Sequence, residues 1–224
     1  EMETVNKDIE FQALQAQIHP HFLSNTLNTV RFLARAQNAY NIEEITTSLI
    51  HMFQFMTSQG DAVVTVQQEI EYIKAYVNVQ EYRYLDKFSV TYEIEPDIAG
   101  CMMPKMLLQP LVENALIHGI EPMEGQGLIS LKGYRDGEQL KFVLTDNGVG
   151  MEPETLAHLL DHSVKEHHRG LSGIGFANVN ERIQLHFGPA YGLQAESVEG
   201  FYTRVEMTLP VVAGGKPYVQ DFDC

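Results

Sequence analysis

The sequence is poor in cysteine, in basic residues and in long apolar runs. Its two cysteines, Cys101 and Cys224, lie far apart and lack the spacing of metal ligands, which fits a protein from a reducing compartment. Only 15 Lys and Arg residues stand against 30 Asp and Glu residues, and the formal net charge of -15 argues against a nucleic-acid surface. A nucleotide held through Mg²⁺ and backbone amides is compatible with that charge.

No run approaches the roughly 18 apolar residues of a membrane-spanning helix, and the chain does not open with a signal-peptide pattern. Its first residue is Glu rather than Met, so we expect a piece of a longer protein, with any membrane segment upstream of it. The 224 residues, of which 44% are hydrophobic, suffice for one large or two small domains.

A histidine-containing stretch, LQAQIHPHFLSNTLN at 14–28, is predicted to be helical because its apolar residues recur three or four apart on either side of Pro20. On a helix His21 and Asn25 share a face, whereas His19 points away from it. A proline inside a helix destabilises it by about 3 kcal/mol. A chain that keeps Pro20 next to a histidine is therefore expected to have a local reason for the proline. The stretch itself leaves two interpretations open: a polar residue on a solvated face, or an imidazole presented for chemistry.

The N-terminal region is expected to form a helical hairpin, with a first helix over about 5–37. Asn41 and Glu44 have the spacing of a capping box for a second helix, which carries a 3-4-3-4 apolar stripe of Ile42, Ile45, Leu49, Met52 and Met56. One hairpin buries two such stripes poorly, so we expect a homodimer with a four-helix bundle. The alternative is that the hairpin packs on its own C-terminal domain.

A second domain is predicted after the break at 58–64. Thr65 and Gln68 form another capping box, for a helix through about Tyr84, and alternating apolar residues predict a strand over 88–94. Pro104 suits the first turn of a further helix.

That further helix is broadly apolar but carries Asn114 and His118 one turn apart on one face. An asparagine in such a helix is either a satisfied polar group of the core or an amide oxygen directed at a hard cation such as Mg²⁺.

Two strands near 127–134 and 139–145 lead into the run DNGVG at 146–150. A carboxylate at a strand end, followed by two glycines, lets the backbone approach a ligand closely, although the same run also suits a tight turn. A short helix is expected from near Pro153, with His158 and His162 one turn apart but no third metal ligand at matching spacing.

The stretch 161–173 is polar, rich in histidine and ends in glycine, as expected of a mobile loop. Gly173-Ile174-Gly175 then opens a helix to about Phe187, and a glycine-rich helix N-terminus is a ready anion site. Strands near 191–198 and 202–209 complete the domain.

Four segments now stand in a characteristic order: QIHPHFLSN, LVENALIHG, DNGVGM and GLSGIGFANVNERI. In that order and spacing they resemble the cytoplasmic part of a sensor histidine kinase, of the subgroup with a PHFL-x-N histidine box (autolysin-regulator and YesM-like kinases). The resemblance spans about residues 10–210. It implies an α+β fold with a dimerising hairpin (1–62), an α/β-sandwich ATP-binding domain of the gyrase and Hsp90 type (63–213) and a tail (214–224).

The resemblance also implies roles for single residues. His21 takes the phosphoacceptor position, with Asn25 one turn on; Asn114 takes the Mg²⁺-ligating position, with His118 near the phosphates. Asp146 takes the position that binds the adenine amino group. The other implied nucleotide contacts are Gly148 and Gly150 beside the base, and Gly173, Ile174 and Gly175 with the loop residues Lys165 and Arg169 around the phosphates. The implied cofactors are ATP and Mg²⁺, and the implied partner is a response regulator receiver domain. The implied location is the cytoplasmic side of a bacterial membrane sensor.

The sequence departs from the family pattern at four points. Phe22 follows the histidine where many of these kinases have an acidic residue, and Ser24 stands where the subgroup usually has Phe or Tyr. Ile117 replaces a lysine after Asn114, and Phe201-Tyr202-Thr203 replaces a Gly-Thr pair near the last strand. Two alternative functions fit the sequence less well. An ATPase of the same superfold places a general-base Glu one turn before the Asn, where this chain has Pro110. A non-catalytic signalling scaffold would not need Asn114, Asp146 and the paired glycines.

Overall fold

The computed structural model describes residues 20–58, 62–85, 87–159 and 171–212. Its first element is a helical hairpin of α2 (Pro20–Ala36) and α3 (Tyr40–Thr57). Between them Asn38 has a left-handed backbone (φ 56°), and the Ala39 N–H reaches the Ala34 carbonyl at 2.9 Å. Asparagine tolerates this conformation, which closes a helix in a tight turn. The predicted first helix up to residue 19 lies outside the described residues.

The predicted cap of the second hairpin helix is wrong. Helix α3 begins at Tyr40, one residue before Asn41, and the preceding Ala39 makes no side-chain cap bond. The Ala39 carbonyl already accepts the N–H groups of Ile42 and Glu43, so no side-chain cap is required there. The expected partner, Glu44, instead hydrogen-bonds to the helix that follows in the chain.

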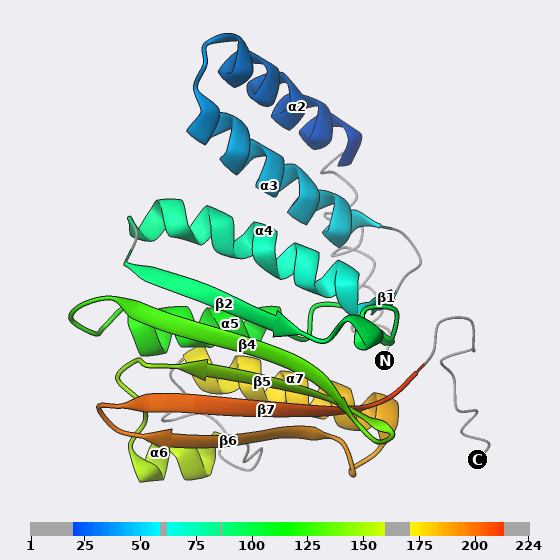
Figure 1. Cartoon of the computed structure of the whole chain (residues 1–224), viewed down its shortest axis with the longest axis vertical. Helices are drawn as coiled ribbons and strands as arrows, with labels where there is room; N and C mark the ends of the chain where they lie inside the picture. The colour runs from blue at the N-terminus through cyan, green and yellow to red at the C-terminus, as the bar shows by residue number, and fades with distance from the viewer. Residues whose placement is uncertain (1–19, 59–61, 86, 160–170, 213–224) are drawn as a thin grey trace, which may run out of the picture.

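Helix α4 (Val66–Tyr84) begins with the predicted capping box of Thr65 and Gln68, which is confirmed. Figure 1 shows α3 lying along α4, with α2 on the outside. The Glu44 carboxylate accepts hydrogen bonds from Asn78 Nδ2 at 3.0 Å and from the Tyr82 hydroxyl at 2.9 Å. The hairpin therefore packs on its own C-terminal domain through α3, as in the alternative above, while α2 keeps an exposed apolar face.

The C-terminal part is an α/β sandwich with a five-stranded sheet in the order β2-β4-β5-β7-β6. The strands are β2 (Phe88–Ile94), β4 (Gly127–Asp136), β5 (Gln139–Asp146), β6 (Gly192–Val198) and β7 (Tyr202–Pro210). Only the β2–β4 pair is parallel. All five strands fall where the sequence predicted them.

A small second sheet pairs β1 (Val63–Thr65) with β3 (Met102–Pro104), which corrects one expectation. Pro104 ends β3 opposite Val63 rather than opening a helix. The helix α5 (Gln109–Asn114) starts five residues later, with Pro110 in its first turn. Pro104 and Pro110 are both compatible with a helix start. The pairing of Pro104 with β1 rules out a helix start at Pro104, and no local sequence pattern shows that pairing.

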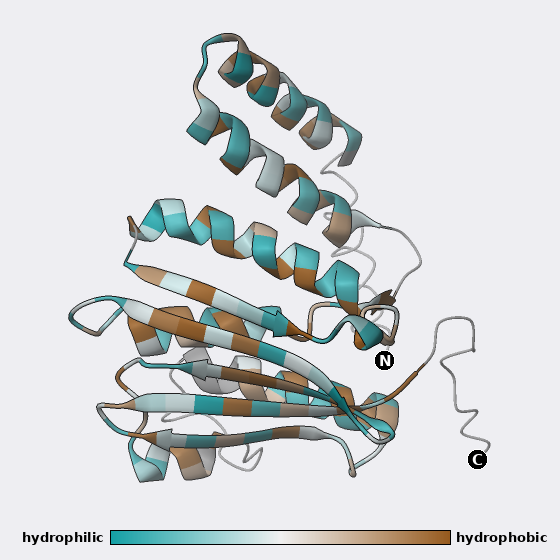
Figure 2. Ribbon diagram, in the orientation of Figure 1, coloured by the Kyte–Doolittle hydropathy of each residue, from teal (hydrophilic) through white to brown (hydrophobic). Residues whose placement is uncertain are grey.

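One face of the large sheet packs against α4, α5 and α7 (Leu171–Phe187), as Figure 1 shows. Hydrophobic and hydrophilic residues alternate along β4 and β7 in Figure 2, and the inward set forms the core. Fully buried members include Leu131, Leu140, Phe142, Leu144 and Met207.

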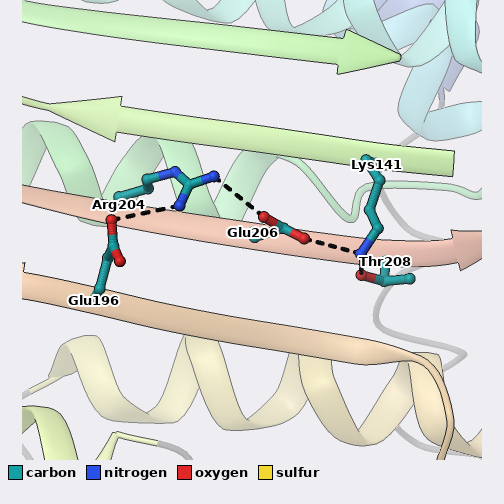
Figure 3. Close-up of polar contacts among 5 residues, drawn as sticks. All are labelled: Lys141, Glu196, Arg204, Glu206 and Thr208. Carbon is teal, nitrogen blue, oxygen red and sulfur yellow. Dashed lines mark hydrogen bonds and ion pairs between the residues drawn. The ribbon is translucent and has the colours of Figure 1, made fainter. Parts of the chain in front are cut away.

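The opposite face of the sheet carries a polar network across β5, β7 and β6 (Figure 3). Lys141 Nζ lies 2.9 Å from Glu206 Oε1 and from Thr208 Oγ1, while Arg204 links Glu206 (3.2 Å) to Glu196 (3.4 Å). Partly exposed ion pairs contribute about 0–1 kcal/mol each to the free energy of unfolding. The main effect of the network is therefore to favour one register of the paired strands, since its charges are complementary only in that register.

Candidate functional site

A pocket opens among α5, the following turn, the end of β5 and α7. Its lining residues are Leu111, Asn114, Ala115, His118, Gly119, Leu144, Asp146, Gly150, Met151, Leu159, Phe176, Thr203 and Val205. The structure thus brings together four residues that the sequence singled out from two distant segments, namely Asn114, His118, Asp146 and Gly150. The pocket has an apolar body with a few convergent polar groups, as small-molecule sites usually have.

Asp146 is the buried charged group of this pocket, with 2% of its surface exposed. Its Oδ1 accepts the Gly148 N–H at 2.9 Å. Burial raises the pKa of the Asp146 carboxyl to about 6, against the opposing effect of the Gly148 hydrogen bond. A carboxylate with spare acceptor capacity in an apolar wall suits a ligand that donates a hydrogen bond, such as an exocyclic amino group.

The glycines near Asp146 are required because protein segments approach each other closely. A Cβ on Gly148 would lie 2.4 Å from the Gly119 carbonyl, and a Cβ on Gly119 would lie 2.6 Å from Asp146 Oδ1. Gly150 has φ +65° and would meet the Val198 carbonyl at 2.2 Å. Gly150 lines the pocket. Gly148 does not line it but donates its N–H to Asp146 and packs closely on Gly119.

Asn114 sits where the helix changes its winding. It ends α5, and the next turn, Ala115–Ile120 (η2), is a π-helix. Such wide turns are rare and concentrate at functional sites. The N-terminal part of α7 packs on this point, since a Cβ on Gly175 would lie 3.8 Å from Asn114 Nδ2. The structure therefore places a glycine of the second predicted box beside the predicted Mg²⁺ ligand.

The remaining predicted phosphate contacts are only partly described. Gly173 and Ile174 lie in the first turn of α7, whereas Lys165 and Arg169 lie outside the described residues. His162, considered above with His158 as a metal pair, also lies outside them. In the described ranges, no group of three or more His, Cys, Asp or Glu side chains is arranged to hold a metal ion. The amide oxygen of Asn114 fits a Mg²⁺ ion that takes most of its ligands from phosphates and water, which is how Mg²⁺ is usually held beside nucleotides.

Nine of the thirteen lining residues were not predicted as site residues, among them Gly119, Met151, Phe176 and Thr203. Thr203 lies directly opposite Asp146 in the β5–β7 ladder, and its hydroxyl is 3.0 Å from Ser197 Oγ. The order of strands in the sheet decides this neighbourhood, and no local pattern gives that order. For Gly119 the signal was a glycine inside an otherwise apolar helix, which often marks a close approach.

His21 and Asn25 lie in the first two turns of α2, on the surface. The Asn25 Nδ2 is 3.3 Å from His21 Nδ1 and 3.2 Å from Nε2, which confirms that the two side chains share a face. None of the hairpin residues that the structure describes lines the pocket, and α3 and α4 separate α2 from the α5–α7 layer (Figure 1). His21 is therefore remote from the pocket in this arrangement.

Comparison with known proteins gives the class of this chain. Residues 9–88 match the family model described as histidine kinase, and residues 103–213 match that of the histidine kinase-, DNA gyrase B- and HSP90-like ATPases. The chain belongs to the sensor histidine kinase family. None of the helices in the described part is both long and apolar enough to cross a bilayer.

Individual relatives agree with this class. The chain is 33% identical over 210 residues to the sensor histidine kinase YesM of Bacillus subtilis, covering 94% of this chain and 35% of that protein. It is 31% identical to the sensor histidine kinase YpdA of Escherichia coli (83% and 32% covered) and 31% identical to the sensor protein LytS of Staphylococcus haemolyticus (86% and 33%). The chain thus spans about a third of the length of these curated relatives.

Solved structures agree on the fold. The histidine kinase domain of the blue-light-activated kinase of Erythrobacter litoralis aligns with a TM-score of 0.50 at 15% identity, covering 86% of this chain and 94% of that one. The catalytic domain of histidine kinase ThkA also has a TM-score of 0.50, at 14% identity, covering 67% and 95%. The predicted class, a helical hairpin followed by an α/β-sandwich ATPase domain, is confirmed.

Proposed function

We propose that this chain is the phosphotransfer and ATP-binding portion of a two-component sensor kinase. It uses ATP to phosphorylate His21 and then passes the phosphoryl group to an aspartate of a response regulator receiver domain. The observation that carries the proposal is the pocket that joins Asn114, Asp146 and Gly150, in a chain that presents a histidine on a separate helix. The family matches of both parts support it.

In this proposal the pocket binds and orients the nucleotide. The Asp146 carboxylate accepts a hydrogen bond from the adenine amino group, and the apolar side chains of Leu144, Met151 and Phe176 pack on the base. The amides at the start of α7, with Lys165 and Arg169, hold the phosphates. The amide oxygen of Asn114 would hold a Mg²⁺ ion, which would supply positive charge to offset that of the phosphates.

The chemical step is an in-line displacement. An unprotonated imidazole nitrogen of His21 forms a bond to the γ-phosphorus, and the bond from that phosphorus to the bridging oxygen of ADP breaks. The proton lost by the imidazole passes to solvent, because His21 is exposed and Phe22 offers no base. Asn25, beside the ring, orients the imidazole. An Asn25→Ala variant with unchanged labelling and unchanged dephosphorylation would remove this role.

We infer that the active form is a homodimer, because α2 keeps an apolar face uncovered. Its exposed side chains are Phe22, Leu23, Val30, Phe32 and Leu33, of which Phe22 and Phe32 are 69% and 66% exposed. Large apolar side chains exposed on a helix favour association with a second copy, as in a four-helix bundle. We place this portion on the cytoplasmic side of a membrane, connected through an upstream segment.

The two alternative functions make different demands on the site. An ATPase would need a carboxylate that activates water, but Pro110 occupies the position one turn before Asn114. Glu113 does not line the pocket. It lies near Tyr72 and Tyr76, where burial raises the pKa of each tyrosine and the charge of Glu113 adds to the increase. A scaffold would not bind the nucleotide.

Calorimetric titration of the chain with ATP, with and without Mg²⁺, tests the first requirement. We expect Mg²⁺-dependent binding that Asn114→Ala weakens, with Asn178→Ala, at an exposed helical position outside the pocket, as a matched control for folding. An absence of binding would favour the scaffold. Release of inorganic phosphate without a phosphoprotein would favour the ATPase.

A further inference from the structure

The segment that leads into α5 is held in an unusual conformation by α4. Met106 has φ +61°, a left-handed backbone that residues other than glycine rarely adopt. The fully buried Glu69 carboxylate of α4 accepts the N–H groups of Met106 at 2.8 Å and Leu108 at 3.0 Å. These bonds fix the start of the helix that ends in Asn114.

One turn further along α4, Tyr72 touches both the hairpin and α5. Its ring stacks on Phe55 of α3, with ring centroids 4.6 Å apart and planes at 24°. Its hydroxyl donates to Oε1 of Gln109, the first residue of α5, at 2.6 Å. The side chain is 2% exposed, so neither end moves without displacing its partner.

Lys105 makes a second connection at the same place. Its Nζ donates to Ser58 Oγ at 2.9 Å and lies 4.9 Å from the centroid of the Phe55 ring. The C-terminal end of α3 thus contacts both ends of the Lys105–Gln109 segment, once through Lys105 and once through Tyr72.

We propose that Tyr72 is a positioning residue that couples the position of the hairpin to the helix carrying Asn114. His21 is remote from the pocket, so phosphoryl transfer within one chain requires the hairpin to move, and that motion changes the stacking of Phe55 on Tyr72. The Tyr72–Gln109 hydrogen bond transmits the change to α5. Coupling between two sites is reciprocal, so nucleotide binding near Asn114 changes the stability of the end of α3.

A stability cycle tests the coupling without any ligand. Phe55→Leu and Gln109→Ala are made singly and together, in the native background and in Tyr72→Phe, and unfolding is measured with denaturant. With Tyr72 present, we expect the unfolding equilibrium constants to depart from additivity by about threefold or more. In the Tyr72→Phe background we expect additivity. Additivity in both backgrounds would overturn the proposal.

Hydrogen exchange tests the functional side, which rests on the proposed function. We expect saturating Mg²⁺-ATP to change the exchange rates of amides 51–58 by about threefold or more, and Tyr72→Phe to abolish this change while still binding nucleotide. Tyr84→Phe is the matched control. Its hydroxyl donates to Glu121 at 2.9 Å, and its ring packs on Phe88 away from the hairpin.

The outcomes separate the two claims. A Tyr72→Phe chain that keeps the exchange response contradicts the coupling and leaves the kinase proposal intact. A native chain that binds no Mg²⁺-ATP contradicts the proposed function, and the stability cycle then decides the coupling alone.

Discussion

Replacing Asp146 by asparagine is expected to stabilise the protein while weakening nucleotide binding. Burial raises the pKa of Asp146 from 3.8 to about 6, so at neutral pH the native state holds a carboxylate in an unfavourable place. Two pKa units correspond to about 3 kcal/mol, which is the largest gain to expect from Asp146→Asn at pH 7. The amide oxygen can still accept the Gly148 N–H.

The gain should depend on pH in a defined direction. The native state takes up a proton on Asp146 at a higher pH than the unfolded state, so the stability of the native chain falls as pH rises from about 4 to above 6. The asparagine variant lacks this contribution. Denaturant unfolding at pH 4 and pH 7 should therefore show a small difference between the two proteins at pH 4 and the full difference at pH 7. Asp136→Asn, at an exposed position, is the control.

The same change removes the charged acceptor that we assign to adenine. A hydrogen bond to a charged group is worth about 1.5–3 kcal/mol, so ATP affinity should fall by roughly tenfold to a hundredfold. A variant that is no more stable than the native chain at pH 7, or that binds ATP equally well, would refute the reasoning on that point.

Three further changes are predicted. Gly119→Ala brings a methyl group within 2.6 Å of Asp146 Oδ1, so it should lower ATP affinity at least tenfold by calorimetry, whereas Gly100→Ala, with open space around it, should not. Thr203→Val removes the hydroxyl that contacts Ser197 and should cost about 1 kcal/mol in denaturant unfolding; an unchanged midpoint would exclude that contact. Phe32→Asp should convert a dimer to a monomer in sedimentation velocity, and a dimer that persists would place the interface elsewhere.

Local patterns predicted most of the fold. The capping box of Thr65 and Gln68 and the five strands of the sheet were correct because they depend on neighbours within a few residues. The predictions for Asn41 and Pro104 were wrong because contacts with segments distant in sequence determine the structure there. Glu44 hydrogen-bonds to α4 instead of completing a cap, and Pro104 pairs with Val63. These are tertiary effects that override local preference.

The candidate site was predictable in its polar residues and not in its walls. Asn114, His118 and Asp146 stand out because polar side chains interrupt apolar segments, and the structure gathers them in one pocket. Thr203 and Phe176 belong to the pocket only through the order of strands and the position of α7, which the sequence does not show. The packing of α3 on α4 depends on the shape of the whole domain in the same way.

The most direct test of the account is labelling of the chain with γ-³²P-ATP and Mg²⁺, followed by acid and alkali treatment. We predict label that is lost in acid, stable in alkali, absent from His21→Gln and retained in the matched His19→Gln variant. Label that persists in His21→Gln, or that survives acid, would contradict phosphorylation of His21.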